Sequence, residues 1–133
     1  MNISMNSISF MGKQEVTNSL LRAAKDAQSA SECLAKSQGP RPYNFLEDCN
    51  IFIKEANNNI REAFADGSIQ EVLNNFDKNS KSKMQEALAP KDFPLQFSKS
   101  NPLDLFSRIM FENAEKSGIS KEPIYKFFNS IKG

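Results

Sequence analysis

The chain has 133 residues, of which 39% are hydrophobic and 25% are charged, and its formal net charge is +1. This composition predicts one soluble globular domain that is long enough to bury a core. The balanced charge excludes the broad basic surface of a nucleic-acid binder, so we do not expect a nucleic acid as partner. The apolar runs are far shorter than the roughly 20 residues that a membrane-spanning helix requires, so no such segment is expected.

Residues 1–12 are predicted to form an extended tail or strap ahead of a single helical domain at 13–133. Ile8 and Phe10 alternate with small polar residues. The stretch lacks the charged start and apolar run of a secretory signal, so we expect a protein that is cytoplasmic or exported without a Sec-type signal.

Three interpretations of this tail remain open. It is a disordered chain end, or an extended segment that forms either a strap on the bundle or a strand added to a partner's sheet edge, or an export tail. The third rests on its content of Ser, Asn and Ile, which resembles that of substrates of bacterial contact-dependent secretion systems.

Two long helices are predicted next, over 14–37 and 44–65. In the first, apolar residues at a 4-3-4-3-4 spacing share one face, namely Val16, Leu20, Ala23, Ala27, Ala30 and Leu34. In the second, the shared face comprises Phe45, Cys49, Phe52, Ala56, Ile60 and Ala63. Asn44 and Glu47 fit a capping box at the start of the second helix.

Two cysteines, Cys33 and Cys49, fall at apolar positions of these helices. Two are too few for a secreted scaffold that depends on disulfides. We therefore predict reduced thiols in the core, with a disulfide between the two helices as the alternative.

A third helix is predicted to begin at Ser68, which forms an S-x-x-E capping box with Glu71. The apolar pattern pauses over 77–83 and resumes at Met84, which fits either one bent helix or two short ones. The pause contains three lysines, Lys78, Lys81 and Lys83. They are expected to solubilise a linker, or alternatively to form a patch for an acidic partner or a phosphate-bearing ligand.

Residues 89–102 contain three prolines, which exclude a helix interior. Phe93, Leu95 and Phe97 alternate with other residues, as in an extended segment. We predict a strap that lies across the bundle with its aromatic rings buried.

Two further helices complete the chain. Asn101-Pro102 predicts the start of the first, Gly118 its end in a Schellman motif, and Ser120 the cap of the second. The predicted fold class is therefore all-α: a compact bundle of five to six helices, with an extended N-terminal tail and a Pro/Phe-containing strap at about 89–102.

Much catalytic chemistry is missing from this sequence. It contains no histidine, which excludes Ser-His-Asp and Cys-His catalysis and histidine-ligated metals. The carboxylates Asp48, Glu55 and Glu62 recur every seven residues among polar neighbours, which is typical of a solvated helix face. We predict no enzymatic activity, no catalytic residues, no metal and no cofactor.

By exclusion, the sequence favours a non-enzymatic module of bacterial type that binds another protein through an apolar helical surface. Adaptors, regulators, chaperone-like proteins and secreted effectors all fit this description. The candidate partner-binding residues are Ile8, Phe10, Phe93, Phe97, Lys78, Lys81 and Lys83.

Two alternative functions also fit the sequence. The first is a small enzyme or ligand-binding protein that uses carboxylates, lysine or tyrosine, with Tyr43 and Tyr125 as hydrogen-bond donors in a pocket. The second is a small inhibitor or immunity-type binder.

Overall fold

The computed structural model describes residues 12–39, 45–94 and 98–132, and within them it has six α-helices and a two-stranded sheet. The elements in chain order are α1 (Lys13–Lys36), α2 (Phe45–Ala65), α3 (Ile69–Asn74), α4 (Lys78–Leu88), β1 (Lys91–Phe93), β2 (Ser98–Ser100), α5 (Pro102–Ser117) and α6 (Glu122–Lys132). The prediction of an all-α bundle with five to six helices is confirmed, although the small sheet was not predicted.

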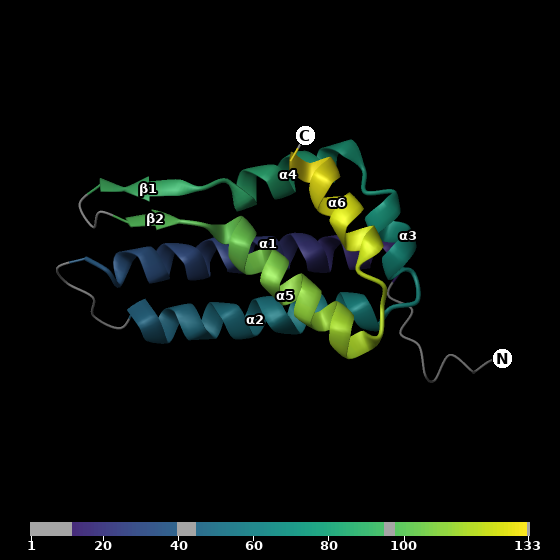
Figure 1. The fold of residues 1–133 in the computed structure, drawn as a ribbon, viewed down its shortest axis with the longest axis horizontal. Helices are drawn as coiled ribbons and strands as arrows, with labels where there is room; N and C mark the ends of the chain where they lie inside the picture. Colours follow the sequence, from purple (N-terminus) through teal and green to yellow (C-terminus); the bar gives the residue numbers. More distant parts are fainter. Residues whose placement is uncertain (1–11, 40–44, 95–97, 133) are drawn as a thin grey trace.

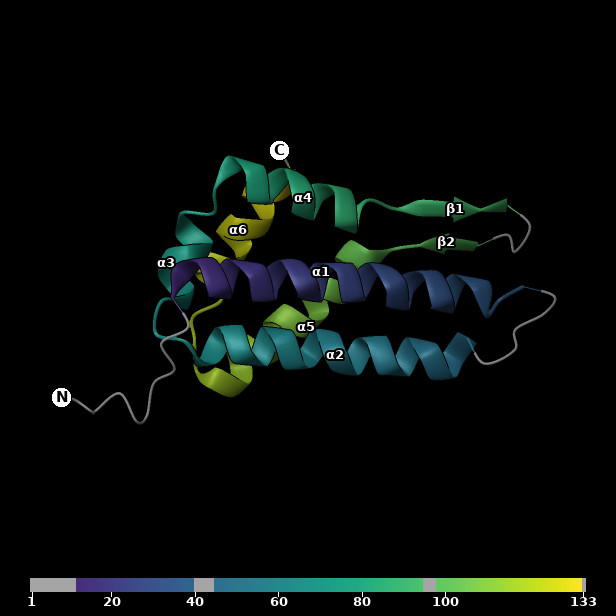
Figure 2. The same ribbon diagram turned by 180° about the vertical axis from the view of Figure 1, so that it is seen from behind.

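Helix α1 is the centre of the bundle and packs against α2, α3, α4, α5 and both strands. It runs antiparallel to α2, and α5 crosses this pair diagonally on one side (Figure 1). Seen from behind, α4 and the hairpin lie along the other edge of α1 (Figure 2). Small side chains make this crowding around α1 feasible, because Ala23, Ala27 and Ala30 are fully buried.

The predicted apolar face of α1 is buried except at its last member. Val16 and Leu20 are inaccessible to solvent, whereas Leu34 is exposed. Helix α5 starts beside β2 and runs away from the hairpin end, so it does not cover the last turns of α1 and the first turns of α2 (Figure 1). Leu34 thus shares the helical spacing of the predicted face but stays exposed, since none of the described helices or strands buries it.

The chain between α3 and α4 breaks at residues 75–77, so two short helices are present rather than one bent helix. Asp77 caps α4: its carboxylate accepts hydrogen bonds from the backbone N–H and the hydroxyl of Ser80, both at 2.8 Å. Lys78, Lys81 and Lys83 therefore belong to a helix, and the prediction of a linker was wrong.

The predicted capping box at Ser68 and Glu71 was also wrong. Ser68 precedes α3, but its hydroxyl makes no capping hydrogen bond to the helix. Instead, Asp66 accepts hydrogen bonds from the Ser68 hydroxyl at 2.7 Å and from the Ser68 N–H at 2.9 Å. The nearer carboxylate engages Ser68 in a local turn and so replaces the expected cap.

The predicted strap at 89–102 is extended where the structure describes it, and it forms an antiparallel hairpin with Phe93 opposite Ser98. Phe93 is only half-buried, because it lies on the outer strand while β2 packs against α1. Its ring lies 5.8 Å from the Lys36 ammonium group. Leu95 and Phe97 lie outside the described residues, so their predicted burial is untested.

The last two helices begin and end close to where the sequence predicts. Pro102 opens α5, although the Asn101 side chain makes no capping hydrogen bond. Gly118 adopts the left-handed conformation with φ of 69°, and the Ile119 N–H donates to the Ala114 carbonyl at 2.9 Å, as in a Schellman motif. The Ser120 hydroxyl accepts from the first N–H of α6 at 3.3 Å.

Both cysteines are free thiols, with Cys49 buried and Cys33 half-buried. The prediction of reduced core thiols thus holds fully for Cys49 and in part for Cys33. Asp48, Glu55 and Glu62 are exposed, as predicted for a solvated face. No helix within the described ranges is long and apolar enough to cross a membrane.

Candidate binding site

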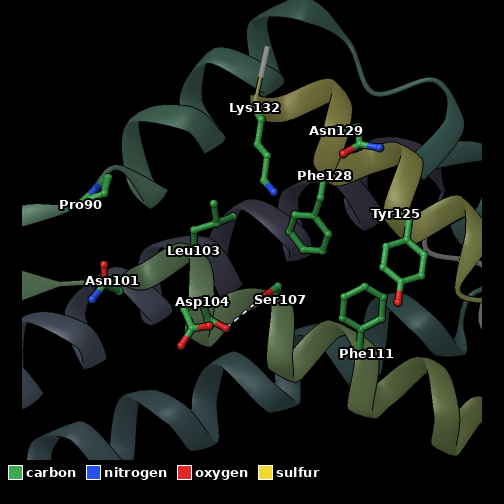
Figure 3. A pocket seen from close by; sticks show the side chains of 10 residues that line it. All are labelled: Pro90, Asn101, Leu103, Asp104, Ser107, Phe111, Tyr125, Phe128, Asn129 and Lys132. Carbon is green, nitrogen blue, oxygen red and sulfur yellow. Dashed lines mark hydrogen bonds between the residues drawn. The ribbon is translucent and has the colours of Figure 1, made fainter.

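A pocket of about 400 Å³ lies between α5 and α6 (Figure 3). Its wall is apolar and its rim is polar. We call it the α5/α6 pocket; it is lined by Pro90, Asn101, Leu103, Asp104, Ser107, Phe111, Tyr125, Phe128, Asn129 and Lys132. This volume and this mixture of aromatic wall and few polar groups are typical of ligand or side-chain binding pockets.

The aromatic wall is held in place by the core. The ring of Phe128 packs edge-on against Phe106 and Phe127, at centroid distances of 5.8 and 5.5 Å. Phe111 continues the wall outward, 6.1 Å from Phe128 and 4.9 Å from Tyr125. The inner part of the wall is therefore rigid, and Tyr125 forms its exposed outer edge.

The rim of the pocket has charges of both signs. Lys132 reaches over the pocket from α6, and Asp104 lies across from it on the first turn of α5 (Figure 3). Asp104 also accepts a hydrogen bond from Arg108 at 3.1 Å, one helical turn along. The rim can orient a polar group of a bound molecule while the wall contacts its apolar part.

A second hollow, of about 510 Å³, lies on the other side of α5, where α1 and α2 are uncovered. We call it the α1/α2/α5 groove. Leu34 and Leu46 are its exposed apolar residues, and the buried Cys49 also lines it. Its remaining lining residues are Ser31, Ala35, Gln38, Asn50, Ile53, Lys99, Asn101, Asp104, Leu105 and Arg108.

The two hollows meet at the start of α5. Asn101 and Asp104 line both of them. We therefore treat the α5/α6 pocket and the α1/α2/α5 groove as one region, which we call the α5 surface. It runs from the hairpin end of α1 and α2 across α5 to α6.

The structure separates the three lysines that the sequence grouped together. Lys83 lies in a groove between α4 and α1, together with Lys25. Lys78 and Lys81 do not line this groove, since successive residues of a helix turn by about 100° and these two lie on another side of α4.

Of the predicted partner-binding residues that the structure describes, namely Phe93, Lys78, Lys81 and Lys83, none lines the α5 surface. Phe93 lies on the hairpin next to Lys36. Ile8, Phe10 and Phe97 lie outside the described residues, as does Tyr43. Tyr125 was considered only as a hydrogen-bond donor in the alternative function, and it does line the α5/α6 pocket.

A sequence signal for Tyr125 did exist. The buried face of α6 consists of Ile124, Phe127, Phe128 and Ile131, and Tyr125 falls outside this spacing. A large aromatic residue off the buried face has to be exposed or covered by a partner.

Burial raises the pKa of several titratable groups among the described residues. Burial raises the pKa of Cys49, which keeps the thiol in the groove protonated. Burial likewise raises the pKa of Cys33 and, against the hydrogen bond from Asn59, that of Asp26. The described part of the chain has no cluster of three His, Cys, Asp or Glu side chains that could hold a metal ion.

Comparison of the chain with protein-family models, with curated proteins and with solved structures found no match.

Proposed function

We propose that this protein is a non-enzymatic binding module whose α5 surface receives a segment of a partner protein. The segment lies across the first turn of α5, with one apolar side chain in the α5/α6 pocket and another in the α1/α2/α5 groove. The proposal keeps the apolar helical surface that the sequence favours, but it places that surface on other residues than the predicted ones.

The observation that carries the proposal is the position of the exposed apolar side chains. Among the described residues, the large hydrophobic side chains that stay exposed are Leu34, Leu46, Ile51 and Tyr125, at 48%, 56%, 55% and 58%. All of them except Ile51 line the α5 surface. Apolar side chains that gather on one face, rather than scatter singly, mark an interaction site.

The shape of the region favours a protein segment over a small molecule. A small-molecule site encloses most of its ligand, whereas here two hollows lie on either side of one helix turn. An extended or helical segment can place two side chains at such a spacing. Tyrosine at the rim is also typical of protein interfaces.

The test is site-specific photocrosslinking in cells that make the protein. Leu46, Tyr125 or, as matched control, Ile51 is replaced by the photoreactive amino acid p-benzoylphenylalanine. We expect the same crosslinked protein from positions 46 and 125 and none from position 51. Equal crosslinking at all three positions, or none at 46 and 125, would contradict the proposal.

The partner obtained in this way is then purified and its affinity measured. Leu46→Ser and Tyr125→Ser should each weaken binding by roughly tenfold or more, because each removes an apolar anchor, while Ile51→Ser should leave binding unchanged. All three positions are exposed, so none of these changes should alter the fold. A small molecule retained by the purified protein, found by native mass spectrometry and lost in Tyr125→Ser, would favour the ligand-binding alternative instead.

A further inference from the structure

Side chains of α1 and α4 line another groove, where these two helices pack together. Figure 2 shows α4 beside α1 on the side of the molecule away from α5. Two adjoining hollows of about 230 and 280 Å³ form it, and both are lined by Lys25, Lys83 and Ala87. We call it the α1/α4 groove. Leu21 and Ala87 give it an apolar floor, since Ala87 is buried and Leu21 is half-buried.

The charge of this groove is unbalanced. Arg22, Lys25 and Lys83 line it, against one carboxylate, that of Glu86 at one end. The rest of the chain contains the other 14 of the 17 basic side chains and the other 15 of the 16 acidic side chains. The residues that line the groove thus have a net charge of +2, against −1 for the remainder of the chain.

The lysines of the groove are not neutralised within the fold. Six ion pairs form among the described residues, and neither Lys25 nor Lys83 takes part in one. Arg22 is held at the edge of the groove, where it donates to the Ser19 hydroxyl at 2.9 Å. Two free ammonium groups thus flank an apolar floor.

We propose that the α1/α4 groove binds an acidic segment of a partner protein. Carboxylates of the segment pair with Lys25 and Lys83, and an apolar side chain between them rests on Ala87 and Leu21. Charge complementarity of this kind speeds association and selects the partner. This proposal goes beyond the function assigned to the α5 surface, because it concerns a different face of the molecule.

The groove fits an acidic peptide better than a nucleic acid. Nucleic-acid binders neutralise many phosphates along a basic surface, whereas the remainder of this chain has a net charge of −1. The described side chains that line the groove include no aromatic ring on which a base could stack.

The experiment measures fluorescence anisotropy of labelled probes with the purified full-length protein at low salt. The main probe is a 12-residue peptide of Glu and Leu, about two Glu for each Leu. A Lys/Leu peptide of the same length, a single-stranded DNA oligonucleotide and vesicles with phosphatidylserine serve as comparison probes. We expect binding of the Glu/Leu peptide alone, with an affinity that falls as salt increases.

Two matched double variants locate the site. Lys25→Glu with Lys83→Glu should weaken peptide binding by roughly tenfold or more. Lys78→Glu with Lys81→Glu changes the net charge equally, on α4 but outside the groove, and should change binding less than about threefold. All four lysines lie at the surface or are half-buried, so both variants should fold. Thermal melting of both variants checks this.

Four outcomes would overturn the proposal: no binding of the Glu/Leu peptide, equal weakening by the two double variants, tighter binding of the oligonucleotide, or tighter binding of the vesicles. Tyr125→Ser should leave peptide binding unchanged. If the proposal for the α1/α4 groove fails, the proposal for the α5 surface is not affected, because the two are tested with different variants and different probes.

Discussion

At the scale of single residues, the start of α4 depends on Asp77. The backbone N–H and hydroxyl of Ser80 donate to its carboxylate, and these hydrogen bonds lower the pKa of Asp77. Ser80 is itself buried, so the loss of Asp77 would also leave a buried hydroxyl without its acceptor. One side chain therefore determines where the second of two short helices begins.

Asp77→Ala should lower the melting temperature at neutral pH by roughly 3–8 °C, because it removes the cap, while Asp77→Asn should stay close to the native value. A lowered pKa means that the carboxylate stabilises the fold above its ordinary pKa of about 4, and that this contribution is lost as pH falls through the lowered value. The gap between the native chain and Asp77→Ala should therefore narrow as pH falls through the lowered pKa of Asp77, down to the gap that a neutral cap maintains, as measured by thermal melts over a pH series. The gap between Asp77→Asn and Asp77→Ala should persist, and its disappearance would contradict this account.

At the scale of elements, the turn between α5 and α6 sets the position of the α5/α6 pocket. Gly118 ends α5 in the left-handed conformation, and a Cβ atom added there would meet no atom within 4 Å. Any cost of a larger residue is thus a cost of backbone conformation and not of steric overlap.

Gly118→Ala should reduce the free energy of unfolding by roughly 1–2 kcal/mol, since an L-residue with a Cβ atom adopts this conformation reluctantly. Gly118→Asn should cost less, because asparagine tolerates the left-handed region. Urea denaturation of the three chains is the measurement. Equal stabilities would show that the turn does not require glycine.

At the scale of the whole molecule, core and α5 surface share one aromatic cluster. Phe128 lines the pocket and packs on two core rings, whereas Tyr125, among the described residues, makes its ring contact with the half-buried Phe111. We therefore expect a substitution of Phe128 to affect mainly stability and a substitution of Tyr125, three positions earlier on α6, to affect mainly binding.

Phe128→Ala should reduce the free energy of unfolding by roughly 3–5 kcal/mol, as for other core phenylalanines. Tyr125→Ala should reduce it by less than about 1 kcal/mol and act on partner binding instead. Guanidinium denaturation and the binding assay described above check the two effects. A large loss of stability in Tyr125→Ala would make this residue part of the core.

The amino-acid sequence by itself determined the local architecture. Helix faces follow from the spacing of apolar residues, and Pro102, Gly118 and Ser120 mark ends that the structure confirms. These signals are readable because they depend on hydrogen bonds and backbone conformations within a few residues. Even so, the hydroxyls of Ser68 and Ser80 donate hydrogen bonds to Asp66 and Asp77. Where two neighbouring side chains can both form a cap, the sequence does not show which of them does so.

The tertiary structure alone decided which apolar faces are covered. Leu34 has the same helical spacing as its buried neighbours, yet it is exposed because α5 starts beside β2 and runs away from that end of α1. In the same way, packing of α4 beside α1 brought Lys83 next to Lys25, which is 58 residues away in the chain. Periodicity specifies which side chains share a face, but the elements that pack on that face are set by the path of the whole chain.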